Sequence, residues 1–369
     1  MELSKEDSFR LNVLLANRPQ AIRIDEAKLI VHGLSPQGEA TIRLNPSTRP
    51  EPYLRAVKEL ISGHVLGSPG GYPIYLRRWT RMGQMRDESL EQLLLLGEPE
   101  AVVAAVCSPG LTDELARRAW WAMEDAENAR RMLGNPAIVS GTMGPILVDY
   151  LIDYLPFETE NDKIMESIRL VLQTGLLDAE RRDELWKKSA RKQAYLVGFL
   201  QALPDDLPGT ASPRVLPEPI ATLAQEGQRC ARLLRRVYAP AGQTFLATVG
   251  TVLAKPPSQD VVTTTFDLLR DYFAAVRPDG DPNLSITGLL AEAEAFATAE
   301  SPAPDVAQLL RLNPSLAPEV AAMRVLSGVG YGLIRAQMLD PSVLGSLMRR
   351  KLTPVIDPLQ NCLRRLGPA

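Results

Sequence analysis

Residues 112–133, TDELARRAWWAMEDAENARRML, decide the fold class of this protein. Apolar residues recur in this stretch at spacings of three and four, which is the period of an amphipathic helix. The run Thr112-Asp-Glu brings acids into a first helical turn, where they complement the helix dipole. The stretch therefore predicts two short helices, over 111–123 and 124–133.

The same spacing continues from Asp87 to the end of the chain, interrupted by Pro or Gly roughly every 10–20 residues, and no segment there alternates convincingly as a strand would. Helices are also expected at 88–96, 98–106, 142–155, 160–175, 178–203, 217–238, 241–254, 259–276, 284–299, 303–312, 317–338, 342–351 and 354–366. No fixed repeat of 34 or 40 residues is visible. We therefore expect a mainly α protein, in which α-hairpins form a HEAT-like array or an irregular helical bundle.

The first 87 residues predict a small α+β module instead. Helices are expected at 4–15 and 53–66, and short strands at 21–24, 28–32 and 39–44. The turn Ser35-Pro-Gln-Gly38 precedes the third of these strands. A final strand is expected at 72–82, after the glycine-rich loop 67–71.

The chain then divides into three predicted domains: 1–87, 88–208 and 209–369. A proline-rich stretch, 203–217, is interpreted as the linker between the two helical domains. The net charge of −3 hides an uneven distribution, because the three domains carry balances of +4, −9 and +2 when their charged residues are counted. A basic module beside an acidic domain indicates two binding faces or a mutual interface, unless solvated helix surfaces simply drift in charge.

Composition excludes several function classes. Hydrophobic residues at 45% and charged residues at 23% indicate a globular chain rather than a disordered one. The only two histidines, His32 and His64, rule out a His-rich metal cage, and three scattered cysteines rule out CxxC sites. We expect neither a metal nor another cofactor. The longest uncharged stretch, 237–254, predicts a buried helical hairpin rather than a membrane span. The N-terminal residues do not have the pattern of a signal peptide. We therefore expect a cytoplasmic location, and we expect no contact with a membrane.

The segment 62–86 contains four arginines and no acid. If 72–82 is a strand, then Tyr75, Arg77, Trp79 and Arg81 share one face, beside Arg78. Interleaved aromatic and arginine side chains suit single-stranded nucleic acid. The alternative packs the aromatic rings on the helical array, with the arginines covering them or pairing with the acidic domain.

Two further groups are candidate binding residues. His64, Gly70 and Gly71 lie at a helix end and in its glycine loop, where backbone amides are able to hold an anion. Trp120 and Trp121 are adjacent on a helix and point about 100° apart, so that one faces the core and the other lies nearer a groove. An exposed tryptophan would be an interface anchor. The simpler interpretation packs both between helices.

Residues 13–25 and, above all, 62–106 (SGHVLGSPGGYPIYLRRWTRMGQMRDESLEQLLLLGEPEAVVAAV) resemble the DsrS family. These are accessory proteins encoded with the reverse dissimilatory sulfite reductase (Dsr) cluster of sulfur-oxidising bacteria. The resemblance extends through 112–133 and along the remaining chain. It implies a cytoplasmic protein that serves the oxidation of stored sulfur, by supporting or regulating production of that machinery. It carries over no catalytic motif.

Three functions are therefore weighed. The leading one is a non-enzymatic accessory or scaffold protein that binds a protein partner, expected among the Dsr components. The alternative is an RNA-binding regulator of Dsr expression that uses 72–86. An enzyme with a site between the α+β module and the helical array stays open. The sequence leaves the oligomeric state unknown.

Overall fold

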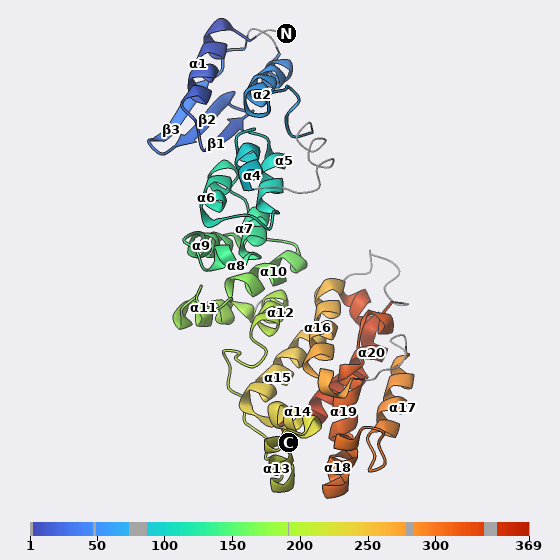
Figure 1. Ribbon diagram of the computed structural model, residues 1–369. Coiled ribbons are helices and arrows are strands. Elements are labelled where there is room, and N and C mark those ends of the chain that lie inside the picture. The colour runs from blue at the N-terminus through green and yellow to red at the C-terminus, as the bar shows by residue number, and fades with distance from the viewer. Residues whose placement is uncertain are drawn as a thin grey trace. The chain divides into compact units, whose positions relative to one another are not determined.

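The computed structural model describes residues 3–46, 49–73, 87–190, 192–277, 284–335 and 345–368 (Figure 1). These residues form two compact units, Met1–Pro156 and Phe157–Ala369. One small antiparallel sheet lies near the N-terminus, and helices make up most of the remaining described residues. The predicted fold class, mainly α with an N-terminal α+β module, is confirmed.

The first unit opens with the expected module. Its strands are β1 (Ala21–Asp25), β2 (Ile30–Ser35) and β3 (Gly38–Arg43), joined in the order β1-β2-β3. Its helices are α1 (Lys5–Ala16), α2 (Pro50–Leu66), α4 (Asp87–Leu94), α5 (Pro99–Val106), α6 (Asp113–Ala122), α7 (Ala126–Leu133), α8 (Pro136–Val139) and α9 (Met143–Tyr154). The two helices predicted from 112–133 are α6 and α7. Thr112 and Asp125 cap them, each accepting a hydrogen bond from a backbone N–H three residues on.

One face of the sheet forms the core of the module. Val31 and Ile42 pair directly across β2 and β3, Ile22 of β1 lies on the same face, and apolar residues of α1 and α2 pack against them. Gly33 admits Leu14 of α1 here, because a Cβ at Gly33 would lie 2.5 Å from the Leu14 side chain. The alternation of each strand therefore places one apolar face inward.

The module does not stand apart from the helices that follow it. Helices α4 and α6 pack against β1, so that residues on both sides of position 87 belong to one compact unit. The expected boundary at 87/88 is thus not a boundary between compact units; the division falls at 156/157 instead.

The second unit consists of helices. They are α10 (Asn161–Val171), α11 (Ala179–Ser189), α12 (Gln193–Ala202), α13 (Glu218–Gln225), α14 (Arg229–Tyr238), α15 (Pro240–Ala254), α16 (Gln259–Tyr272), α17 (Ile286–Phe296), α18 (Pro304–Leu312), α19 (Ala317–Ser327) and α20 (Gly345–Leu366). Short 3-10 turns, η1 (Ala274–Val276), η2 (Pro314–Leu316) and η3 (Tyr331–Leu333), connect some of them. The uncharged stretch 237–254 lies mostly in α15, which is largely buried, as expected. Among the described residues, no helix has both the length and the apolar character needed to cross a membrane.

The proline-rich stretch 203–217 does not separate two units. Helix α12 before it packs against α15 and α16 after it. The stretch itself is fastened in place, because the Arg214 amide donates to the Tyr238 carbonyl and Thr244 Oγ1 donates to the Gly209 carbonyl. The Arg214 guanidinium also donates to the Arg365 carbonyl and to Glu319. The stretch 203–217 was expected to be a linker between two domains, but these contacts make it an ordered segment packed within the second unit.

Candidate functional site

The arginine and aromatic residues of the predicted nucleic-acid surface fall outside the part of the chain that the structure describes. These are Tyr75, Arg77, Arg78, Trp79 and Arg81. Just before them, residues 71–73 are helical, so the strand expected from residue 72 does not begin there. The RNA-binding alternative rests on this segment and stays a prediction.

The glycine loop uses its amides internally. The Gly71 amide donates to Ser62 Oγ at 2.7 Å, and the Tyr72 amide donates to the Glu98 carboxylate at 3.2 Å. Burial raises the pKa of Glu98, and the hydrogen bond from Tyr72 opposes that rise. The Gly71 amide is therefore already engaged by a neutral hydroxyl, and the chain's own Glu98 accepts from the amide of the next residue, Tyr72. His64, at the end of α2, and Gly70 are both exposed.

Trp120 and Trp121 face different surroundings, as their angular separation predicts. Trp120 is buried and meets the edge of Tyr150 at a centroid distance of 4.8 Å. Trp121 is half-buried, and it packs on the sheet rather than between helices. Its indole donates to Glu39 at 3.2 Å and lies beneath the Arg23 guanidinium, 4.8 Å away. The interpretation that both rings pack between helices is wrong for Trp121.

The outer face of the sheet carries a polar cluster that the sequence analysis missed. Arg23, His32 and Thr41 lie in register across the three strands, opposite the apolar face. Glu39 joins them, 2.6 Å from His32 Nδ1 and 3.3 Å from Arg23. Burial alone would raise the pKa of Glu39, but hydrogen bonds from Trp121 and His32 and the charge of Arg23 lower it overall. The alternation of polar and apolar residues in the three predicted strands could have predicted this cluster, since it places Arg23, His32 and Thr41 on one face.

This polar cluster fastens α6 to the sheet. Glu39 Oε1 lies within hydrogen-bond distance of His32 and Arg23, and Oε2 accepts from Trp121, so that both carboxylate oxygens are engaged. The arrangement fits a structural joint between α6 and the sheet.

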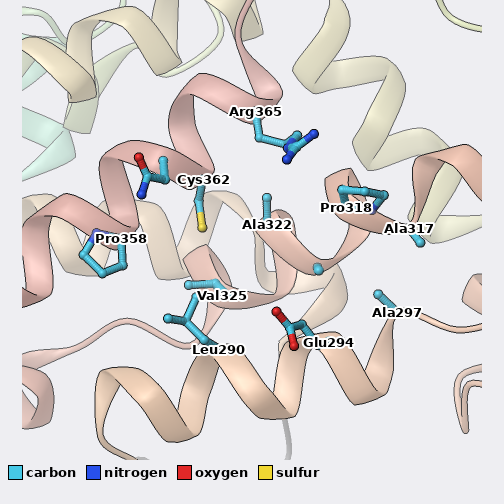
Figure 2. Close-up of a pocket in the computed structure, with 12 residues that line it drawn as sticks. Leu290, Glu294, Ala297, Ala317, Pro318, Ala322, Val325, Pro358, Cys362 and Arg365 are labelled. Carbon is cyan, nitrogen blue, oxygen red and sulfur yellow. The ribbon is translucent and has the colours of Figure 1, made fainter.

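In the second unit, α17, α19 and α20 enclose a groove of about 580 Å³ (Figure 2). Figure 2 shows Leu290, Glu294 and Ala297 along α17 and Pro358, Cys362 and Arg365 along α20, with residues of α19 between them. The residues that line it are Leu290, Glu294, Ala297, Ala317, Pro318, Ala321, Ala322, Val325, Pro358, Asn361, Cys362 and Arg365. We call this the α17–α20 groove.

Small apolar side chains form most of the α17–α20 groove. Four alanines contribute to its lining, so that another backbone is able to approach the helices closely. Glu294 and Arg365 are exposed, and they place opposite charges on the α17 and α20 sides. The groove thus combines an apolar surface with a charge of each sign.

An ion pair between a buried arginine and a half-buried glutamate joins two walls of the groove. Arg324 of α19 is only 9% exposed and donates to Glu292 of α17 at 2.5 Å. The same guanidinium stacks on Phe296 at 3.7 Å and donates to the Val276 carbonyl at 2.9 Å. An arginine paired on three sides in this way fixes the separation of α17 and α19. The groove is consequently a preformed feature of this unit.

The lining of the groove includes one thiol, that of Cys362. Burial raises the pKa of the Cys362 thiol to about 11, against a weaker lowering by Arg365, so that the thiol is protonated near neutral pH. Among the described residues, no three His, Cys, Asp or Glu side chains come together as a metal-binding group. Three of the four lining alanines lie on α19, and the fourth, Ala297, follows the end of α17. The groove forms only where these residues meet α20, so that sequence spacing alone carried no signal for it.

Comparisons with known proteins identify no relatives. No protein-family model, no curated protein and no solved structure matches the chain.

Proposed function

We propose that this protein is a non-enzymatic accessory protein that binds another protein, and that the α17–α20 groove receives an apolar helix of that partner. The observation that carries the proposal is the preformed apolar groove of about 580 Å³, with Glu294 and Arg365 on opposite sides. Amphipathic helices bind grooves of this kind through apolar anchors spaced along one face.

The charges on the groove select the partner further. A helix that brings a basic residue to Glu294 and an acidic residue to Arg365 would bind in one orientation, because the reverse orientation opposes like charges. The small alanine side chains leave space in the groove. Larger apolar side chains of the partner helix, such as leucine or phenylalanine, would fill that space.

The resemblance to the DsrS family supports the choice of partner. We place the protein in the cytoplasm, where it would support the oxidation of stored sulfur through contacts with components of the Dsr system. Regulation of that machinery through a bound protein is compatible with the same groove.

The proposal is tested by measuring the affinity of the full chain for each purified Dsr component, with the wild type and two charge variants. Glu294→Lys and Arg365→Glu change exposed side chains, so that both variants are expected to fold. We expect binding of one component by the wild type and a fivefold or greater loss in each variant. Failure of every component to bind would overturn the proposed partner class.

A second measurement tests the absence of catalysis. The purified protein alone is incubated with sulfide, sulfite and polysulfide, and the sulfur species are followed over time. We expect no turnover. Conversion of any of these compounds by the isolated chain would make it an enzyme and overturn the proposal.

A further inference from the structure

Helix α14 divides its residues sharply between two faces. One face is apolar and buried: Cys230, Ala231, Leu233, Leu234, Val237 and Tyr238. The remaining positions are all arginine: Arg229, Arg232, Arg235 and Arg236. Packing of the apolar face does not require arginine at the exposed positions Arg229, Arg232 and Arg235.

The four arginines line one cavity, of about 720 Å³, together with residues that end α16 and form η1. Asp271 is the only carboxylate in this lining, and it is already engaged, 3.0 Å from Arg277 and 3.5 Å from Arg270. We call this the α14 cavity. Its lining therefore carries a clear excess of positive charge.

One of the four arginines is held in place by the protein. Arg236 donates through Nε and Nη2 to Asp205, at 2.7 Å each, and its guanidinium stacks on the Tyr272 ring at 3.8 Å. Arg229, Arg232 and Arg235 are exposed, and none of them forms an ion pair with a described residue. Three guanidinium groups are thus available to an anion.

We propose that the α14 cavity binds a polyphosphate, a ligand with two or more linked phosphoryl groups. Guanidinium groups bind phosphate oxygens through paired N–H donors. From Arg229 to Arg235 the helix rises about 9 Å, at about 1.5 Å per residue, so that the three groups span more than one phosphoryl group. A concave site of this size suits a small molecule.

The aromatic residue of the cavity argues against recognition of a nucleobase. Tyr272 is the only aromatic side chain in the lining, and Arg236 covers one side of its ring. Phe245 stacks on the same ring at a centroid distance of 3.9 Å. Because single-stranded nucleic acid needs free rings on which bases stack, the cavity binds the phosphoryl groups alone.

Isothermal titration of the full chain with tripolyphosphate tests the proposal, with ATP and a short RNA as comparison ligands. The variants are Arg229→Gln/Arg232→Gln and Arg232→Lys, and the matched control is Arg311→Gln/Arg350→Gln, which removes two exposed arginines elsewhere in this unit. We expect one tripolyphosphate per chain, at least tenfold weaker binding in the double variant, a smaller loss for Arg232→Lys, and unchanged binding in the control.

ATP is expected to bind no more tightly than tripolyphosphate, since its base has no ring to stack on. Three results would overturn the proposal: no binding of tripolyphosphate, an equal loss in the control, or RNA that binds more tightly than tripolyphosphate and loses the same affinity in the double variant. The last result would assign the arginines to nucleic acid. None of these outcomes depends on the α17–α20 groove.

Discussion

The Trp121 indole donates a hydrogen bond to Glu39 at 3.2 Å, across 82 residues of sequence. This bond joins β3 to α6, and it adds to the packing of α4 and α6 on β1 within one compact unit. Because His32 and Arg23 meet the same carboxylate, the negative charge of Glu39 is what organises the joint.

The Glu39 carboxylate predicts a pH-dependent contribution to stability. Its pKa is lower in the folded state than the usual value of 4.5. A lowered pKa means that the contribution is present above pH 4.5 and is lost as the pH falls through the folded-state pKa. Glu39→Gln should therefore reduce the free energy of unfolding by about 1 kcal/mol at pH 7, and by less at pH 3.5.

Chemical denaturation at both pH values measures this difference. Glu59→Gln, an exposed change in the middle of α2, is the control and should have no effect at either pH. An equal effect of Glu39→Gln at pH 7 and pH 3.5 would show that the charge of Glu39 does not organise the joint.

Asp113 and Glu114 are neighbours in sequence, but replacing each by alanine should lower the free energy of unfolding by different amounts. Asp113 caps the start of α9, accepting bonds from the Thr142 amide, the Thr142 hydroxyl and the Met143 amide. Glu114 has a pKa lowered to about 2, chiefly by its hydrogen bond with Arg117, but it is half exposed and its closest partners are on its own helix.

We expect Asp113→Ala to cost about 1–2 kcal/mol, as the loss of a helix cap does. Glu114→Ala should cost about 0.5 kcal/mol, because water screens surface ion pairs. Denaturant unfolding of the two variants compares them directly. A larger loss for Glu114→Ala would mean that the capping contact is not the stronger interaction.

Two helical glycines predict opposite effects of the same substitution. A Cβ at Gly198 of α12 would lie 2.5 Å from Ile168 and 2.9 Å from the Met165 carbonyl of α10. At Gly250 of α15 the nearest neighbour is 3.6 Å away. Gly198→Ala should therefore destabilise by about 1–3 kcal/mol through overpacking, and Gly250→Ala should be neutral or stabilise by up to about 1 kcal/mol. Thermal unfolding of both variants measures the contrast, and similar midpoints would contradict the close packing of α10 and α12.

The sequence predicted the α+β module and the helical character after Asp87 well, because both depend on local period and turn residues. The sequence did not predict the helix boundaries that depend on tertiary packing. One helix was expected over 217–238, but Gly227, with a φ of +93°, separates α13 from α14. Two helices were expected over 342–366, but α20 continues through Pro354 and Pro358.

The continuity of α20 has a physical reason. Each proline inside a helix costs about 3 kcal/mol. The buried apolar stripe of α20, which includes Leu352, Leu359 and Leu363, outweighs that cost, since burying one such side chain contributes about 1.5–3 kcal/mol. The sequence pattern predicts a helix boundary before Pro354, because the sequence alone does not show how much apolar surface the continuous helix buries.

For the candidate sites too, the sequence predicts what depends on local helix geometry and does not predict what depends on tertiary packing. Different environments for Trp120 and Trp121 followed from helix geometry. The partners of Trp121 did not, since Glu39 and Arg23 are brought to it by the fold of the sheet. The α17–α20 groove likewise depends on three helices whose contacts no local pattern encodes.

Filling the α17–α20 groove tests most directly whether it binds a protein partner, as proposed. Ala321 of α19 is half-buried in the lining, and Ala247 of α15 is exposed outside it. The affinity for the proposed Dsr partner is measured for the wild type, Ala321→Arg and Ala247→Arg. We predict at least tenfold weaker binding for Ala321→Arg and wild-type affinity for Ala247→Arg. Unchanged affinity in a folded Ala321→Arg variant would contradict the account.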